Sequence, residues 1–555
     1  MHSRSWRYWA AAVLSAGLLE LPFPLAGPLP PVRSLVAWFA LVPLMWAVSR
    51  AAENANRPLR RAFLLAYLCG VLWYAGNCYW IYATMKIHGD LPPVISALLL
   101  VGFSLVLGLY FGLFGLGFAL VRRRLGVVRA LAAAPFLWVA LDLAGARITS
   151  VPWDQLGYSQ VDNGFMTPLA PWTGVYGISF ALVAVNAFYA SVFLGVFRLG
   201  WRRSQTRAWI TCINIGVLFL ISGFELLPRD ASTSATAVLV QPNLDVLAQQ
   251  ENVWDAPQVW NQHIAEFAKL ANEQCKTFIA GIPQTEAENG EIVCPPYPTH
   301  PDLVVWPEAP AFSFEESDPR FRQTMASLAR AEQSTFVVGG IGTDISATDN
   351  TIDYYNSAMI FGADGAWIGR YDKIHLVPFG EYIPFKNLLT FAHKLTGKVS
   401  DFSRGREHTV FRIVDQHGQA HGYGIFICYE AVFADEVRHL AQHGAQVLVN
   451  ISDDGWYGDT SAPWQHLNQT RMRAIENRRW ILRDTNNGVT AAIDPYGRVR
   501  QSIPRHQTDA LPAEFGFLSG VTFYSAYGDV FAWLCALLSV GIIVWAMNKR
   551  PPKRR

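Results

Sequence analysis

The chain has 555 residues, about four times the length of an average domain, so several structural units must share it. Its composition is 51% hydrophobic and 16% charged, against roughly 25% charged residues in ordinary soluble domains, which indicates a membrane component and excludes disorder and a collagen-like fibre. The net charge of +2 hides an acidic middle between basic ends, because residues 229–525 carry 23 basic and 35 acidic side chains. The sequence has no basic patch interleaved with aromatic residues, so nothing in it indicates a nucleic-acid partner.

Long apolar segments dominate the first part of the chain. A transmembrane helix needs roughly 20 mainly apolar residues. Eight segments meet or approach this length: 8–23, 32–49, 62–83, 95–120, 128–145, 170–197, 208–227 and 526–547. The first is the weakest, because Glu20 and three prolines crowd its end, and a cleaved signal peptide over residues 1–27 is the alternative interpretation. The sequence therefore predicts a multi-pass α-helical membrane domain with about eight transmembrane helices.

The basic residues between these segments predict their orientation. Arginines cluster before the first segment and after the second, fourth and sixth, whereas the intervening loops hold only Arg33, Lys86 and Arg147. The chain also ends in a basic tail. We therefore expect both termini in the cytoplasm. The predicted domains are a membrane domain with seven helices (1–227), an extracytoplasmic domain (228–525), and an eighth helix with the basic tail (526–555).

The extracytoplasmic domain shows an α/β pattern, in which short apolar runs alternate with stretches of helical periodicity. Strands are predicted at 236–242, 302–308, 334–341, 355–362, 423–430, 445–452 and 488–495. Helices are predicted at 261–274, 318–333 and 431–444. About 300 residues with this pattern can bury a large core of their own.

Cys428 is a candidate nucleophile, because it ends the apolar run GIFI and precedes a helical pattern. A helix N-terminus favours the thiolate over the thiol, although a buried core cysteine is the alternative interpretation. A thiol that attacks a carbonyl needs a base and a group that holds the oxyanion. Glu308 closes the run DLVVWPE, Lys373 lies in RYDKIHLVPFGEYIP, and Glu381 follows in the same stretch. Taken singly, each of these charges is typical of a solvated surface.

Taken in order, these stretches resemble a known family. WPE, YDKIHLVPFGEYIP and ICYE are similar to the three catalytic stretches of the nitrilase (carbon–nitrogen hydrolase) superfamily, and their wording resembles the bacterial apolipoprotein N-acyltransferases. The resemblance extends through residues 450–466, 471–479 and 485–498, and through 152–160 and 174–187 in the membrane part. It implies a nitrilase-like α-β-β-α sandwich domain on the periplasmic face of the cell inner membrane.

The resemblance also implies roles for particular residues. Cys428 becomes the nucleophile, Glu308 the general base and Lys373 the stabiliser of the oxyanion. Further matching positions would support the site or shape its pocket: Glu381, Tyr429 and Glu430. Two tryptophans resemble aromatic positions that border the active site, although packing explains them equally: Trp254 and Trp456.

The implied reaction moves an acyl chain from a phospholipid to the amino group of a diacylglyceryl-cysteine apolipoprotein, through a thioester and with ping-pong kinetics. We expect no cofactor or metal, because the 13 histidines show no metal-ligand spacing and the sequence has no phosphate-binding glycine loop. We also expect a monomer. A membrane-tethered amidohydrolase, in which water resolves the acyl enzyme, is the alternative. A non-catalytic scaffold and a transporter are further alternatives. The presence of all three candidate catalytic residues counts against the scaffold. The acids near the ends of the apolar segments look interfacial, which counts against the transporter.

Two segments carry separate hypotheses. The stretch 383–397 has apolar residues among lysines and a histidine, which is typical of an interfacial helix that dips into lipid or of an amphipathic helix packed on its own domain. Cys275 and Cys294 bracket a polar stretch and either form a disulfide or stay unpaired. Residues 275–300 are longer than the usual connection in the family, so no role is carried over to them.

Overall fold

The computed structural model describes residues 6–54, 56–195, 231–244, 300–308, 316–345, 351–378, 380–382, 402–415 and 417–549. The chain divides into two compact units. Unit 1 comprises Met1–Pro228, Asp459–Met472 and Thr522–Arg555, and unit 2 comprises Arg229–Gly458 and Arg473–Val521. The division falls within helix α14 (Ala462–Asn477). The predicted helices 261–274 and 383–397, the pair Cys275 and Cys294, and Trp254 lie outside the described residues.

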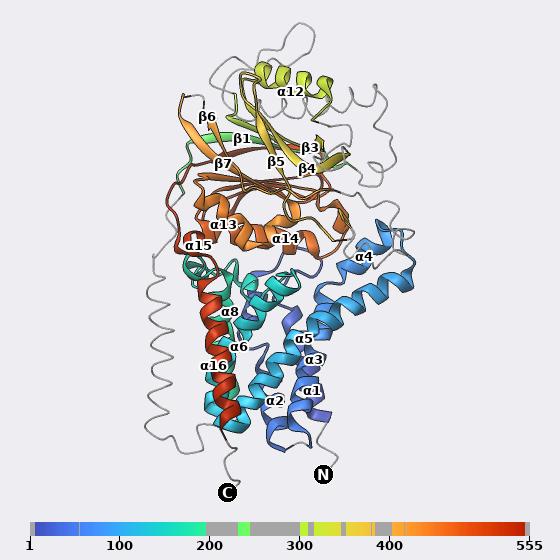
Figure 1. The fold of residues 1–555 in the computed structure, drawn as a ribbon, viewed down its shortest axis with the longest axis vertical. Coiled ribbons are helices and arrows are strands. Elements are labelled where there is room, and N and C mark those ends of the chain that lie inside the picture. The colour runs from blue at the N-terminus through green and yellow to red at the C-terminus, as the bar shows by residue number, and fades with distance from the viewer. Residues whose placement is uncertain are drawn as a thin grey trace. The chain divides into compact units, whose positions relative to one another are not determined.

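Unit 1 is helical (Figure 1). Besides part of α14, its described helices are α1 (Trp6–Glu20), η2 (Pro31–Trp38), α2 (Val42–Asn54), α3 (Pro58–Asn77), α4 (Trp80–Ile87), α5 (Pro93–Leu125), α6 (Val127–Ile148), η3 (Leu156–Gln160), η4 (Thr167–Leu169), α7 (Ala170–Thr173), α8 (Val175–Phe193), α15 (Phe523–Tyr527) and α16 (Val530–Asn548). Apolar runs account for the long members of this set, since a helix satisfies every backbone hydrogen bond within one segment.

Five helical segments of the described chain are long and apolar enough to cross a membrane: Pro31–Glu53, α5, α6, α8 and α16. The pair α3 and α4, bent by 48° at a short break, makes a sixth if it counts as one span. The predicted number of eight is not confirmed. The 15 residues of α1 rise only about 22 Å against a hydrocarbon core of about 30 Å, and residues 208–227 lie outside the described chain.

Helices α3 and α5 pack side by side, and glycines of α5 permit their close approach (Figure 1). A Cβ atom at Gly115 would lie 2.6 Å from the carbonyl oxygen of Ala62, and one at Gly112 would lie 2.6 Å from the ring of Phe63. Small residues at such spacing let helix backbones meet closely within a membrane. The glycines therefore determine how near α3 and α5 come to each other.

Unit 2 holds two sheets, each with six strands in the described part of the chain. The first sheet has the order β12-β1-β2-β3-β4-β5, with β1 (Ala235–Gln241), β2 (Leu303–Trp306), β3 (Thr335–Ile345), β4 (Ile352–Phe361), β5 (Trp367–Asp372) and β12 (Asp509–Phe515). The second has the order β11-β10-β9-β8-β7-β6, with β6 (Val410–Val414), β7 (Ala420–Ile427), β8 (Val447–Ser452), β9 (Ile481–Thr485), β10 (Thr490–Ile493) and β11 (Val499–Ile503).

The two sheets share one topology. Three neighbouring strands run parallel in each sheet, β1, β2 and β3 in the first and β7, β8 and β9 in the second. Antiparallel strands extend both sheets at their edges. The register places Val305 opposite Val337 in the first sheet and Ile425 opposite Val449 in the second. Strands β2 and β8 each lie between two parallel neighbours, whereas β7 lies between the parallel strand β8 and the antiparallel edge strand β6.

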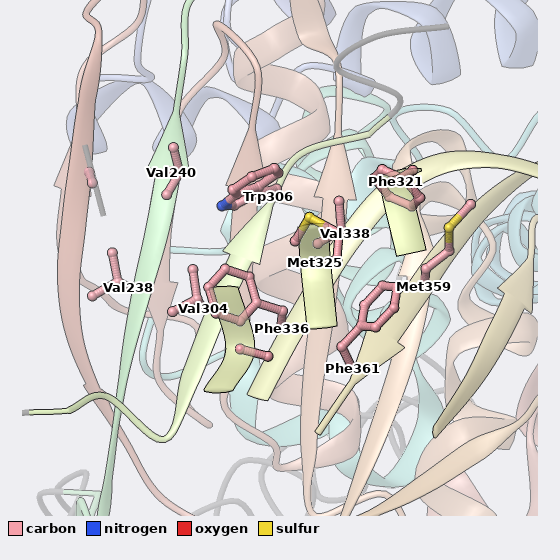
Figure 2. Packing of buried hydrophobic residues seen from close by; sticks show 12 residues of the cluster. Val238, Val240, Val304, Trp306, Phe321, Met325, Phe336, Val338, Met359 and Phe361 are labelled. Carbon is pink, nitrogen blue, oxygen red and sulfur yellow. The ribbon is translucent and has the colours of Figure 1, made fainter. Parts of the chain in front are cut away.

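Helices cover the outer faces of the two sheets. Helix α12 (Pro319–Glu332) lays Phe321 and Met325 onto the first sheet, where they meet Trp306, Phe336 and Phe361 in a buried cluster (Figure 2). Helix α13 (Ala434–Gln442) packs on β7 of the second sheet, and strands of the two sheets contact each other between these helices. The predicted sandwich of two sheets between helices is thus confirmed.

The seven predicted strands all form, with ends shifted by a few residues. The sequence missed five described strands: β5, β6, β9, β11 and β12. Strand β9 shows the physical reason. It carries Arg483 and Asp484 in the run ILRDT, which breaks the apolar pattern, yet every residue of the strand is buried. Charge inside a strand is tolerated here because Arg483 pairs with Asp454.

Candidate active site

The three residues proposed to carry the chemistry follow strand ends in unit 2. Glu308 comes two residues after β2, Lys373 directly follows β5, and Cys428 directly follows β7. All three side chains are buried. Side chains at the carboxyl ends of strands gather at one edge of a sheet, which is where α/β folds place their ligand sites. The structure brings together residues that are 65 and 120 positions from Glu308.

The backbone at Cys428 is strained. Its φ is +47°, a value that residues other than glycine seldom adopt, and it lies between β7 and the short 3-10 helix η8 (Cys428–Val432). A strained strand-to-helix turn of this kind lifts a nucleophile's side chain out of the sheet. The predicted strand-to-helix turn is therefore present, and its strain is a feature that the sequence did not reveal.

Lys373 joins two carboxylates. Its Nζ donates hydrogen bonds to Oε1 of Glu308 and to Oε1 of Glu381, each at 2.8 Å. The Nδ2 of Asn356 donates to the same two oxygens, at 2.7 and 2.6 Å. The backbone N–H of Asp453 donates to Oε2 of Glu308 at 2.8 Å. Both carboxylate oxygens of Glu308 thus accept hydrogen bonds, and the ammonium group of Lys373 lies between the carboxylates of Glu308 and Glu381.

The electrostatics of Lys373 follow from this arrangement. Burial alone would lower the pKa of its ammonium group, but Glu308, Glu381 and Cys428 raise that pKa well above its usual value. The charged ammonium form of Lys373 is therefore favoured at neutral pH. A fixed cation beside the nucleophile is the group that a developing oxyanion requires.

Cys428 differs from the expectation that a helix N-terminus favours its thiolate. Burial and the nearby carboxylate of Glu308 raise the pKa of the thiol well above its usual value, and Lys373 and a hydrogen bond with Ser452 offset only part of this rise. The helix that follows is also a five-residue 3-10 turn, with little dipole to offer. The thiol form of Cys428 is therefore favoured at rest, and any attack by this sulfur requires that it lose its proton.

Glu430 ties the loop of Lys373 to the turn of Cys428. Its carboxylate accepts hydrogen bonds from the hydroxyl of Tyr371 at 3.0 Å, from the backbone N–H of Ile374 at 2.6 Å and from that of Ile427 at 2.7 Å. Burial raises its pKa, and the bonds from the backbone counter that rise. The carboxylate therefore clamps two segments that are far apart in the sequence, which is a support role.

The other predicted site residues occupy different places. Tyr429 is buried next to the nucleophile, with its ring 5.1 Å from the ring of Phe433 and 6.4 Å from that of His375. Trp456 lies half-buried in the 3-10 helix η9 (Asp454–Tyr457), which directly follows the strand-end residue Asp453. Within the described residues, no group of three or more histidine, cysteine or acidic side chains is arranged to hold a metal ion.

Sequence reasoning missed a buried polar network behind the nucleophile. Ser452 donates from its hydroxyl to Oδ1 of Asp454 at 3.1 Å, and Arg483 donates to Oδ2 of the same carboxylate at 2.7 Å. Arg483 also bonds the side chain of Asn450. The run NISDD contains four polar residues, but the local sequence does not indicate which side chains they contact. Asn356 of β4 was missed for the same reason.

The fold defines the class of protein. Residues 238–514 match the family model described as carbon-nitrogen hydrolase, and residues 15–188 match the one described as apolipoprotein N-acyltransferase N-terminal domain. Among solved structures, Saccharomyces cerevisiae Nit3, a member of branch 10 of the nitrilase superfamily, is 18% identical with a TM-score of 0.34, over 52% of this chain and 92% of that chain. The family-model match shows that residues 238–514, most of which belong to unit 2, carry a carbon–nitrogen hydrolase domain.

Relatives that match nearly the whole chain narrow this class. The apolipoprotein N-acyltransferase of Geobacter metallireducens is 32% identical over 550 residues, which cover 98% of this chain and 96% of that protein. The one from Photobacterium profundum is 28% identical over 534 residues, covering 94% and 92%. The chain belongs to the apolipoprotein N-acyltransferase family, and it is an acyltransferase of the nitrilase superfamily.

Proposed function

We propose that this protein transfers an acyl chain from a membrane phospholipid to the N-terminal amine of diacylglyceryl-cysteine apolipoproteins, through a thioester on Cys428. The observation that carries the proposal is the buried thiol of Cys428 at a strained turn, electrostatically coupled to Glu308 and Lys373. The family relatives are named for lipoprotein N-acylation. The apolar helices of unit 1 suit a protein whose two proposed substrates, a phospholipid and a diacylated apolipoprotein, both reside in a membrane.

The first half-reaction loads the enzyme. Glu308 takes the thiol proton as the sulfur of Cys428 attacks the ester carbonyl carbon of the phospholipid. The carbonyl oxygen becomes an oxyanion, and the ammonium of Lys373 stabilises it. When this intermediate collapses, the ester C–O bond breaks and the glycerol oxygen takes the proton from Glu308. The products are a lysophospholipid and a thioester on Cys428.

The second half-reaction transfers the acyl group from Cys428 to the apolipoprotein. The α-amine of the apolipoprotein attacks the thioester carbonyl, Glu308 takes a proton from the amine, and Lys373 again stabilises the oxyanion. The C–S bond then breaks, an amide C–N bond remains, and the sulfur of Cys428 recovers the proton. Because one product leaves before the second substrate reacts, ping-pong kinetics follow. The thioester reaches the amine rather than water only in a site that excludes bulk water.

We place this chemistry on the periplasmic side of a bacterial inner membrane. The proposal rests on the basic loops of the sequence, which predict cytoplasmic termini and an extracytoplasmic domain over residues 228–525. We further propose that Glu381 and Glu430 support the site, Glu381 through Lys373 and Glu430 through the loop that carries it. Tyr429 would shape the pocket, with Trp254 and Trp456 bordering it. The enzyme would act as a monomer.

Intact mass spectrometry tests both half-reactions. The full-length protein is incubated with a defined phospholipid, then with a diacylated lipopeptide, alongside Cys428→Ser and the control Cys535→Ser, a buried free cysteine of α16 in unit 1. We expect one acyl mass on the wild type and on C535S, none on C428S, and discharge into the lipopeptide.

Other outcomes would change the assignment. Discharge to free fatty acid with the lipopeptide unchanged would favour the amidohydrolase-like alternative, in which water resolves the acyl enzyme. An acyl mass on C428S equal to that on the wild type would remove Cys428 as the nucleophile. A folded wild type that never carries the acyl group during turnover would rule out the covalent route.

A further inference from the structure

Unit 1 contains a cavity lined by four arginines. It has a volume of about 340 Å³ and lies between the start of α3 and the end of α5. The described residues that line it are Arg57, Pro58, Leu59, Arg60, Leu120, Arg123 and Arg124. No carboxylate is among these lining residues. The volume falls within the roughly 300–1,000 Å³ that is typical of small-ligand pockets.

Four like charges around one cavity repel one another; solvent screens part of this repulsion, and an anion between the guanidinium groups relieves the rest. The neighbouring Arg122 shows the contrast, because its guanidinium pairs with the carboxylate of Glu53. Arg123 and Arg124 instead use one guanidinium nitrogen each to reach main-chain carbonyls, of Ala52 at 3.3 Å and of Lys549 at 2.8 Å. A guanidinium carries five N–H donors, so these contacts orient the two side chains and leave most donor capacity for a ligand.

The start of α3 adds a second source of positive potential. Its N-cap, Arg57, makes no side-chain capping hydrogen bond, and the first helical bond runs from the N–H of Arg61 to the carbonyl of Arg57. Pro58 has no N–H, so the amides of Leu59 and Arg60 are the first donors of this 20-residue helix. Uncapped amides at a helix N-terminus favour an anion, and here guanidinium groups surround them.

The apolar neighbours indicate what the anion is attached to. Leu120 lies four residues before Arg124 and seven after Leu113, so the three share one face of α5. Leu64 lies four residues after Arg60 on α3, and Leu64 and Leu113 are 36% and 45% exposed. An exposed leucine thus lies about one turn inside the cationic end of α3 and about three turns inside that of α5. Phosphate at the arginines and hydrocarbon along the leucines is the pattern of a phospholipid.

We propose that this cavity binds the phosphate of an anionic phospholipid, as a site in unit 1 that is separate from the acyl-transfer site in unit 2. Arginine forks match phosphate oxygens in pairs, whereas lysine offers only a point charge. The proposal does not depend on the acyl-transfer reaction. A free phosphate ion shares the same recognition chemistry, so the test must separate these two sources.

The test uses the full-length protein in detergent, with Cys428→Ser throughout so that acyl transfer cannot change the mass or the stability. Native mass spectrometry counts bound lipid, and tryptophan fluorescence reports the Tm. The probes are dioleoylphosphatidylglycerol, dioleoylphosphatidylcholine and sodium phosphate. The variants are R57Q/R60Q, the charge-preserving R57K/R60K, and the control R129Q/K549Q, which also removes two cations but from residues outside the cavity lining.

Either lipid can also enter the acyl-transfer site, so we expect the parent to bind one more molecule of phosphatidylglycerol than of phosphatidylcholine, and the extra molecule to raise the Tm. R57Q/R60Q should weaken this binding at least tenfold and R57K/R60K by a smaller factor, while R129Q/K549Q should match the parent. Equal effects of sodium phosphate and phosphatidylglycerol would replace the lipid by a free phosphate ion. Equal binding of phosphatidylcholine, or an equal loss in R129Q/K549Q, would overturn the site, because either result means that the cavity arginines recognise nothing specific.

Discussion

Asn356 holds the carboxylates of Glu308 and Glu381 close together. A single Nδ2 donates to Glu308 and to Glu381, next to the ammonium of Lys373, which bonds the same two oxygens. Two carboxylates this close would repel each other without these donors. The amide therefore positions Glu308, the proposed general base, and lets Lys373 remain between the acids.

Replacing Asn356 with alanine tests this positioning role. The loss of a buried hydrogen-bond donor costs about 1–3 kcal/mol, which corresponds to a roughly 5- to 150-fold fall in kcat/KM if the cost falls on the transition state. Transfer to a lipopeptide is the measurement. The control is Asn477→Ala, which removes a buried amide that donates to the carbonyl of Arg473 at 2.9 Å. If N356A and N477A lose Tm and activity in the same proportion, Asn356 has only a structural role.

Asp453 makes the stability of unit 2 depend on pH. Burial, followed by the carboxylate of Glu308, raises its pKa to about 7, although Gly455 and Asn486 donate hydrogen bonds to it. A raised pKa means that folding favours the protonated carboxyl group. The stability from this group is therefore complete below the unfolded pKa of about 3.9, and it is lost as the pH rises through about 7.

Asp453→Asn should remove this dependence. The variant has one acceptor oxygen in place of two, so it keeps the bond from Gly455 or from Asn486 but not both, and this loss is the same at every pH. The Tm of the wild type should fall more than that of D453N between pH 5 and pH 8.5, so that the difference D453N minus wild type grows with pH. A difference that stays constant across this range would show that Asp453 does not titrate there.

At the residue scale, the order of Glu308, Lys373 and Cys428 along the chain could be predicted, together with the turn at Cys428. The partners could not. Asn356 and Asp453 bond Glu308 across 48 and 145 positions of sequence, and no local pattern records such contacts. The direction of the thiol pKa was also wrong in the prediction, because desolvation depends on what surrounds the sulfur in three dimensions.

The packing of α3 on α5 depends on the side of α5 that carries Gly115. A methyl group there would lie 2.6 Å from the carbonyl oxygen of Ala62, which is backbone and cannot move alone. Gly102 lies on the same helix, and a Cβ built on it meets no atom within 4 Å. The two glycines therefore form a matched pair within one helix.

Substitution of these glycines by alanine should change stability in opposite directions. Alanine is favoured over glycine inside a helix by about 1 kcal/mol, so Gly102→Ala should keep or raise the Tm. Gly115→Ala gains the same propensity but forces the helices apart, at a cost of about 1–3 kcal/mol, and should lower the Tm by several degrees. Thermal unfolding in detergent measures both. Equal Tm changes would mean that the contact at Gly115 relaxes freely.

Periodicity predicted seven strands of unit 2 but missed the edge strands and the interior strand β9. The seven buried strands read as apolar runs, whereas β11 exposes four of its five residues and β9 buries an arginine and an aspartate. An exposed edge strand lacks the apolar signal, and a buried charge masks it. Both kinds of strand are set by their neighbours in the sheet, which the local sequence does not contain.

Topology is the prediction that belongs to the whole molecule. Basic residues flank alternate apolar segments, so a reporter after Arg555 should lie in the cytoplasm and one after His300 should lie outside it. We expect a C-terminal green fluorescent protein fusion to fluoresce, and alkaline phosphatase to be active only when fused after His300. Active phosphatase after Arg555 would reverse the orientation and move the proposed acyl transfer to the other face of the membrane.

The sequence by itself determined that this protein has a helical membrane part and an α/β domain, and it placed three reactive residues at strand ends in a family order. These properties are local, since they depend on runs of apolar residues and on side chains within one stretch. Only the tertiary structure decided that Lys373 joins two acids, that Asn356 and Asp453 hold Glu308, and that burial raises the pKa of the Cys428 thiol. Such properties arise from desolvation and from hydrogen bonds between residues that are distant in sequence, so they exist only once the chain has folded.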